Sequence, residues 1–133
     1  MAGNRAKLTG KGRSGRFYAV QKSVYDTLAY YSLSANALKL WHDMMTQYNG
    51  KNNGAICAIL SQLEPRVWKN GTLYRSLDEL IAKGFIKRNF QGGIGPAGKK
   101  PSRYRFTHLP ADAPEFDCPS IGPTNDYQKW TPK

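Results

Sequence analysis

The sequence lacks a long apolar run and has very few cysteines. No apolar stretch approaches the roughly 18 residues that a membrane-spanning helix needs. The basic N-terminus is not followed by the apolar segment of a secretory signal. The two cysteines, Cys57 and Cys118, stand far apart, so we expect reduced thiols rather than a disulfide scaffold. These absences predict a cytoplasmic protein that does not enter a membrane.

Motifs of catalysis and metal binding are missing as well. The chain has no Gly-rich phosphate loop followed by Lys-Ser/Thr, no Cys-x-x-Cys pair and no His-Glu-x-x-His. Its histidines, His42 and His108, stand 66 positions apart and outside any recognised nucleophile motif. Asp78 and Glu79 are adjacent, so on a helix they diverge by about 100° and cannot form a carboxylate pair. We therefore expect no enzyme, no metal site and no cofactor.

Acidic residues are scarce, and the resulting charge is the strongest global signal. Lys and Arg number 20 against 9 acids, which gives a net charge of +11. The excess is uneven, because residues 1–105 carry +13 and residues 106–133 carry −2. A small domain with this charge attracts polyanions in a salt-sensitive way. Nucleic acid is the favoured partner, with a merely soluble basic protein or attraction to anionic lipid as alternatives.

The composition divides the chain into three parts. Residues 1–16 carry five basic residues and no acid, which predicts a flexible basic arm that tracks phosphates or is simply solvated. Residues 17–109 hold most of the apolar residues and predict the folded domain. Residues 110–133 hold five of the eight prolines, which predicts a Pro-rich extended tail, partly docked.

The segment that begins near Trp68 predicts the central helix of this domain. Its apolar stripe comprises Leu73, Leu77, Leu80 and Ile81. Asn70 is a suitable N-cap, and Gly84 is a suitable left-handed terminator. The opposite face is polar and consists of Lys69, Asn70, Thr72, Tyr74, Arg75 and Asp78. An exposed helix with such a face either reads DNA or is an ordinary amphipathic surface helix.

The residues before this helix predict two further helices and a short strand. Ser34 is a strong N-cap for a helix that ends at Asn49-Gly50. Its buried stripe is expected to be Leu38, Trp41, Met44 or Met45, and Tyr48. Ala55-Ile56 predicts a very short strand, and a short helix ends at Leu63 before Pro65. The turn from Pro65 to Trp68 then leads into the central helix.

The residues after Gly84 predict a β-hairpin. Phe85–Phe90 and Ser102–His108 have strand character, and the loop between them is rich in glycine. Alternation places Tyr104, Phe106 and His108 on one face. Arg103 and Arg105 are expected on the other, where Lys99 and Lys100 add charge. The hairpin is either a wing against the phosphate backbone or a solubilising surface.

The residues from Ser34 to Phe106 resemble winged helix-turn-helix proteins of bacterial mobile elements and phages. The likeness rests on Leu33-Ser34, on Tyr48–Gly54, and on Thr72–Leu80 followed by Gly84-Phe-Ile86. It covers about 55% of the chain. The resemblance implies an α+β winged helix-turn-helix, with a three-helix core and a small antiparallel sheet, flanked here by the basic arm and the Pro-rich tail.

From the residues and the resemblance together, we expect a sequence-specific, double-stranded DNA-binding protein of the nucleoid, a transcriptional regulator of a phage or mobile element. The expected DNA-binding residues are Lys69, Asn70, Thr72, Tyr74, Arg75, Lys87, Arg88, Lys99, Lys100, Arg103 and Arg105. Two alternatives stay open: a winged-helix protein that inhibits a host protein or nucleoprotein complex, and a replication-initiation protein. The sequence also leaves homodimerisation open.

Overall fold

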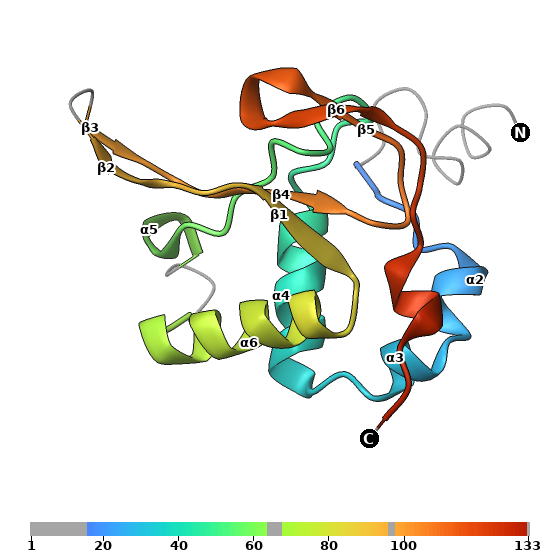
Figure 1. Ribbon diagram of the computed structural model, residues 1–133. Helices are drawn as coiled ribbons and strands as arrows, with labels where there is room; N and C mark the ends of the chain where they lie inside the picture. The colour runs from blue at the N-terminus through green and yellow to red at the C-terminus, as the bar shows by residue number, and fades with distance from the viewer. Residues whose placement is uncertain (1–15, 64–67, 96–97, 133) are drawn as a thin grey trace, which may run out of the picture.

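The computed structural model of the protein describes residues 16–63, 68–95 and 98–132 (Figure 1). Its helices are α2 (Lys22–Tyr25), α3 (Leu28–Tyr31), α4 (Ala35–Met45), α5 (Leu60–Leu63), α6 (Asn70–Ala82) and the 3₁₀ turns η2 (Pro114–Phe116) and η3 (Asp126–Lys129). Its strands are β1 (Ile86–Phe90), β2 (Gly93–Gly95), β3 (Gly98–Lys100), β4 (Arg103–Phe106), β5 (Ala111–Ala113) and β6 (Cys118–Ile121). The strands form the antiparallel pairs β1–β4, β2–β3 and β5–β6. The expected mixture of helices and small antiparallel sheets is confirmed.

Within the described ranges, no helix has the length and apolar character required to cross a membrane. The expected basic arm, apart from Arg16, and the expected turn at 65–67 lie outside the described residues.

Helix α4 forms because Ser34 caps it, as expected. The Ser34 hydroxyl accepts a hydrogen bond from the Ala37 amide at 3.2 Å, which satisfies a first-turn donor. The helix ends at Met45, so it is shorter than predicted, and its buried residues are Ala37, Leu40, Trp41, Met44 and Met45. Leu38 and Tyr48 are only partly buried. The expected stripe was therefore wrong at Leu38, because Ala37 and Leu40 lie on the buried face instead, and at Tyr48, because the helix ends before it.

Helix α6 packs against α4, and its far end has the structure predicted from Gly84. Gly84 has φ +83, its amide donates to the Ile81 carbonyl at 3.1 Å, and the Phe85 amide donates to the Leu80 carbonyl at 3.0 Å. This pattern is a Schellman motif. The N-cap prediction was wrong. Lys69 is the N-cap residue, because its carbonyl accepts the first hydrogen bond of the helix, from the Leu73 amide at 2.9 Å. Its side chain makes no capping hydrogen bond.

The hairpin after α6 continues beyond the pair β1–β4. In that pair Ile86 faces Phe106, Lys87 faces Arg105 and Arg88 faces Tyr104, with an irregularity before Phe90. Beyond it, β2 and β3 form a separate narrow pair that projects from the body (Figure 1). The short strand expected at Ala55-Ile56 is present as a bridge between Ile56 and Tyr104.

The C-terminal residues are docked on the domain, as expected in part, but they also form elements that the extended-tail prediction did not include. Strands β5 and β6 form a hairpin, and the chain then runs down beside α3 (Figure 1). Tyr127 joins the main core and stacks on Phe85, with ring centroids 5.3 Å apart and planes 9° apart. The Asn125 amide donates to the Thr107 carbonyl at 2.8 Å. Proline excludes an α-helix here, yet it permits strand ends and a 3₁₀ start at Pro114.

Candidate nucleic-acid interface

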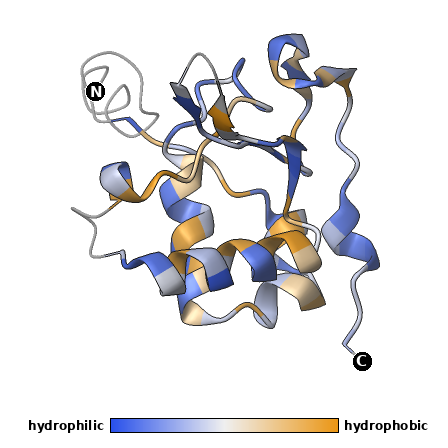
Figure 2. Cartoon of the chain, turned by 60° about the vertical axis from the view of Figure 1, so that its left-hand side comes forward, coloured by the Kyte–Doolittle hydropathy of each residue, from blue (hydrophilic) through white to orange (hydrophobic). Residues whose placement is uncertain are grey.

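The outward face of α6 presents polar side chains along its N-terminal half. Tyr74 is 58% exposed, and Lys69, Asn70 and Arg75 are exposed as well. Leu73, Leu77 and Leu80 are buried on the opposite side, so the stripe fixes which face points outward. Figure 2, in which α6 crosses the lower front, shows hydrophilic and hydrophobic residues alternating along it. Among the described residues, α6 packs mainly against α4 and β1, and its polar face is accessible.

The guanidinium of Arg75 lies back over the first turn of α6. Its Nη2 donates to the Thr72 hydroxyl at 3.4 Å, a long bond between exposed or half-buried groups. A Cβ built on Gly71 would lie 3.4 Å from Arg75 Nη1, an ordinary contact distance, so the guanidinium rests close to the first-turn backbone. Such a weak contact is readily exchanged for a stronger acceptor, such as a base edge or a phosphate.

The hairpin carries four exposed cations. Lys87 and Arg88 lie on β1, and Lys99 and Lys100 lie on β3. Arg88 is partly held, because its guanidinium lies 5.5 Å from the Tyr104 ring centroid and its Nη2 is 3.4 Å from the Tyr104 hydroxyl. In Figure 1 the hairpin projects toward the same side of the molecule as the N-terminal end of α6.

The two arginines of β4 are not exposed, although the wing prediction placed them against the phosphate backbone. Arg105 is only 7% exposed, and its Nη1 donates to the Thr124 hydroxyl at 3.2 Å. Arg103 is half-buried, donates to the Ala55 carbonyl at 2.9 Å and lies 4.3 Å from the centroid of the Phe116 ring. The C-terminal segment supplies Thr124 and Phe116, so it covers a face that the hairpin alone would leave to solvent. Arg105 is therefore not accessible to a ligand, and the Arg103 guanidinium is largely occupied by contacts within the protein.

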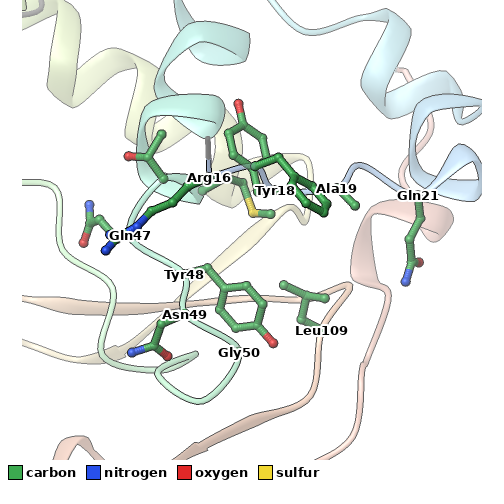
Figure 3. A pocket seen from close by; sticks show the side chains of 12 residues that line it. Arg16, Tyr18, Ala19, Gln21, Gln47, Tyr48, Asn49, Gly50 and Leu109 are labelled. Atoms are coloured by element: carbon green, nitrogen blue, oxygen red, sulfur yellow. The ribbon is translucent and has the colours of Figure 1, made fainter. Parts of the chain in front are cut away.

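The segment before α2 and the end of α4 border an open hollow of about 1030 Å³ (Figure 3). Figure 3 shows the Tyr18 and Tyr48 rings on opposite sides of it. The lining residues are Arg16, Phe17, Tyr18, Ala19, Gln21, Met45, Thr46, Gln47, Tyr48, Asn49, Gly50 and Leu109. This lining includes no carboxylate, histidine or thiol among the residues that the structure describes, so it offers no acid–base pair.

His42 anchors the N-terminal segment beside this hollow. The Tyr18 hydroxyl is 2.8 Å from His42 Nδ1, and the Tyr30 hydroxyl is 3.3 Å from Nε2. Burial lowers the pKa of the His42 imidazole. Both ring nitrogens are therefore engaged in structural contacts. Across the described ranges, no three His, Cys, Asp or Glu side chains are grouped so that they could hold a metal ion.

Comparisons with protein-family models, with curated proteins and with solved structures find no match for this chain.

Proposed function

We propose that the chain is a winged helix-turn-helix protein that binds double-stranded DNA, without catalytic activity, as a regulator encoded by a phage or mobile element. The observation that carries the proposal is the pairing of two features. The polar face of α6 is accessible, and the hairpin that follows α6 directly bears exposed lysines and projects on the side of the molecule where α6 begins (Figure 1).

The order of the elements supports the winged-helix interpretation. Helix α4 is followed by the Ile56 bridge, then by α5 and α6, then by β1, the projecting hairpin and β4. A winged helix-turn-helix places its second helix of the pair in the major groove and its wing on the adjacent backbone. In this order α6 is the recognition helix, and β2–β3 is the end of the wing.

The proposed division of labour follows from side-chain chemistry. Arg75, Tyr74 and Thr72 would reach base edges, since Arg forms the common bidentate contact with guanine O6 and N7. Lys69 and Asn70 lie at the exposed start of α6, where the helix N-terminus favours phosphate. Lys87, Arg88, Lys99 and Lys100 would contact phosphates and set the register, because backbone contacts position without specifying sequence.

The test is a selection from random duplexes, followed by binding titrations on the selected duplex and on a scrambled one. Arg75→Ala should weaken binding to the selected duplex by about 1–3 kcal/mol and leave the scrambled duplex nearly unaffected. The double variant Lys99→Ala/Lys100→Ala should weaken both duplexes alike. Lys22→Ala, on α2, is the control for loss of one charge. Equal losses on both duplexes for Arg75→Ala would remove it from the base-reading residues.

A protein partner is the second candidate function, favoured by the apolar surface of α2 and α3. Tyr25, Leu28 and Tyr31 are 49%, 54% and 61% exposed, and the two tyrosine rings meet edge to face. Exposed aromatic clusters are common at protein interfaces. Capture of one stoichiometric protein from nuclease-treated host lysate at high salt, lost in Leu28→Ser, would favour this candidate. If the protein binds DNA but captures no stoichiometric protein, DNA binding is favoured instead.

A further inference from the structure

The open hollow beside the end of α4 is bordered by three aromatic side chains. Phe17 and Tyr18, which belong to the segment before α2, are 69% and 37% exposed. Tyr48, which follows α4, lies across the hollow from Tyr18 (Figure 3). Aromatic rings favour stacked or edge-to-face contacts with other flat rings. The hollow therefore offers several surfaces on which a flat ligand group can stack.

Both sides of the hollow are held by contacts within the protein. The Tyr18 hydroxyl is 2.8 Å from His42 Nδ1, which fixes the orientation of the Tyr18 ring. On the other side, Tyr48 is partly buried and packs against the main core. The loop that follows Tyr48 is held by a hydrogen bond of 2.9 Å from the Asn49 amide to Asn52 Oδ1. Rings that are already in place lose little conformational freedom when a ligand binds.

The charge around the hollow is positive. Arg16 contributes to the lining, and the exposed Lys51 directly follows the lining residue Gly50. The described lining contains no carboxylate. Asp43, the nearest acid along α4, already accepts a hydrogen bond from Trp68 Nε1 at 2.6 Å. This charge distribution favours an anionic ligand.

The size and openness of the hollow favour a polymer over a small molecule. Pockets for small molecules have volumes of about 300–1,000 Å³ and enclose most of the ligand. This hollow has about 1030 Å³ and is open to solvent, so a chain can enter and leave it. A proline-rich peptide also packs on aromatic side chains, but it carries no phosphate to match the positive charge. Single-stranded nucleic acid is flat-ringed, anionic and polymeric.

We propose that the hollow binds single-stranded nucleic acid, with bases stacked on Phe17, Tyr18 and Tyr48 and a phosphate paired with Arg16. A cationic groove combined with stacking aromatic side chains is the usual means of binding single strands without reading their sequence. The segment before α2 lies on the side of the molecule away from the projecting hairpin (Figure 1). The inference therefore goes beyond the proposed duplex binding and does not depend on it. With both surfaces, one chain would contact the junction at which a duplex opens.

The test compares two labelled strands of equal length and charge in anisotropy titrations with the full chain. One strand has about ten thymidines, and the other has abasic sites in their place. The wild-type protein should bind the thymidine strand at least about tenfold more tightly, because only this strand can stack. Ultraviolet cross-linking and peptide mass spectrometry should place thymines on Phe17, Tyr18 or Tyr48. Equal affinities for the two strands would reduce the binding to polyanion attraction and overturn the proposal.

Variants at exposed positions test the site without disturbing the fold. Phe17→Ala should weaken binding of the thymidine strand by at least about fivefold and leave duplex binding unchanged. Tyr31→Ala is the matched control, since Tyr31 is 61% exposed on α3 and does not line the hollow. Arg16→Ala should reduce the steepness of the salt dependence for the single strand by about 0.7. Tyr48→Phe, which keeps the ring, should bind as the wild type does. Unchanged melting temperatures verify that the variants are folded.

The outcomes separate this inference from the proposed function. Equal effects of Phe17→Ala and Tyr31→Ala on the thymidine strand would overturn the single-strand site and leave duplex binding standing. Binding of the thymidine strand through Phe17 by a chain that binds no duplex would overturn the proposed function alone. Binding of a proline-rich peptide that depends on Phe17, without preference for thymidine over abasic strands, would assign the hollow to a peptide instead. Competition by thymidine monophosphate as strong as by the strand would assign it to a free nucleotide.

Discussion

At the scale of single residues, Asn53 shows how one buried amide can hold distant segments together. Its side chain is 1% exposed, and its Nδ2 donates to the carbonyls of Phe106 at 2.9 Å and of Leu109 and Pro110 at 3.2 Å. Its Oδ1 accepts from the Phe106 amide at 2.6 Å. In the sequence, Asn53-Gly54 is a residue pair typical of a turn. The amide instead ties the loop after α4 to the end of β4.

Replacing Asn53 should therefore be costly. Asn53→Ala leaves the Phe106 amide and several carbonyls without their partner in a buried place, so the free energy of unfolding should fall by about 2–4 kcal/mol. Urea denaturation measures this loss. Asn36→Ala, at an exposed position of α4, is the control and should change stability by less than about 0.5 kcal/mol. Similar small effects at both positions would contradict the role assigned to Asn53.

His108 is the residue from which a pH dependence follows. It is 4% exposed, lies against Trp41 with ring centroids 5.4 Å apart, and its Nε2 has no hydrogen-bond partner among the described residues. Burial lowers the pKa of its imidazole from 6.5 to about 4. At pH values between these two pKa values, His108 is protonated in the unfolded chain but neutral in the folded chain. Stability therefore falls as pH falls through this interval.

The expected loss from His108 is about 2 kcal/mol between pH 7 and pH 5, measured by urea denaturation at each pH. His108→Gln should flatten this slope and leave the smaller contribution of His42, whose pKa is also lowered by burial. Burial acts to raise the pKa of Glu79, but its hydrogen bonds from Ser34 and Lys83 outweigh this effect and lower the pKa, so the contribution of Glu79 is lost only at more acidic pH. A variant as steep as the wild type would show that His108 is not the group responsible.

At the scale of elements, the C-terminal segment depends on the glycine that ends α6. A Cβ at Gly84 would lie 2.7 Å from the Asp126 carbonyl carbon and 2.7 Å from the Tyr127 amide nitrogen, and φ there is +83. Gly84→Ala should therefore cost about 3 kcal/mol or more in thermal or urea unfolding, from backbone strain and from displacement of η3. Gly50→Ala is the matched control, since φ is +94 and nothing lies within 4 Å. It should cost only about 1 kcal/mol.

Equal losses in the two glycine variants would mean that the close approach of η3 contributes nothing. A larger loss at Gly84, together with exposure of Tyr127 to quenchers, would support the packing seen here. The comparison separates the cost of the backbone conformation from the cost of the contact.

The elements differ in how far the sequence could predict them. Helix α6 was predictable because its leucine stripe and Gly84 are local signals, and the same stripe correctly implied that Tyr74 and Arg75 are exposed. The cover over Arg105 was not predictable, since alternation shows that two faces differ but not what packs on the second. Thr124 lies 19 residues away and has no pattern that announces the contact. The pairing of Tyr127 with Phe85 is equally non-local.

At the scale of the whole molecule, the question is whether the net charge of +11 or its placement governs association. If net charge governs association, every basic residue contributes to the attraction of DNA. If a localised cluster of cations governs it, counterions are released only from the phosphates that those cations contact. The exposed cations proposed to meet phosphates are Lys69, Lys87, Arg88, Lys99 and Lys100. Five such contacts predict a slope of log K against log salt of about −4 to −5.

Two double variants with the same net charge distinguish these possibilities. Lys99→Ala/Lys100→Ala should reduce the steepness of the slope by about two, because two phosphate contacts are lost. Lys22→Ala/Lys129→Ala removes two charges from α2 and η3, which lie on the side of the molecule away from the projecting hairpin (Figure 1), and should leave the slope unchanged. The slopes are measured by anisotropy titrations from 50 to 200 mM salt. Any contact between residues 1–16 and DNA would steepen the slopes of the wild type and of both double variants equally, so it does not affect the comparison. Equal reductions in both variants would assign attraction to total charge and leave the hairpin without a special role.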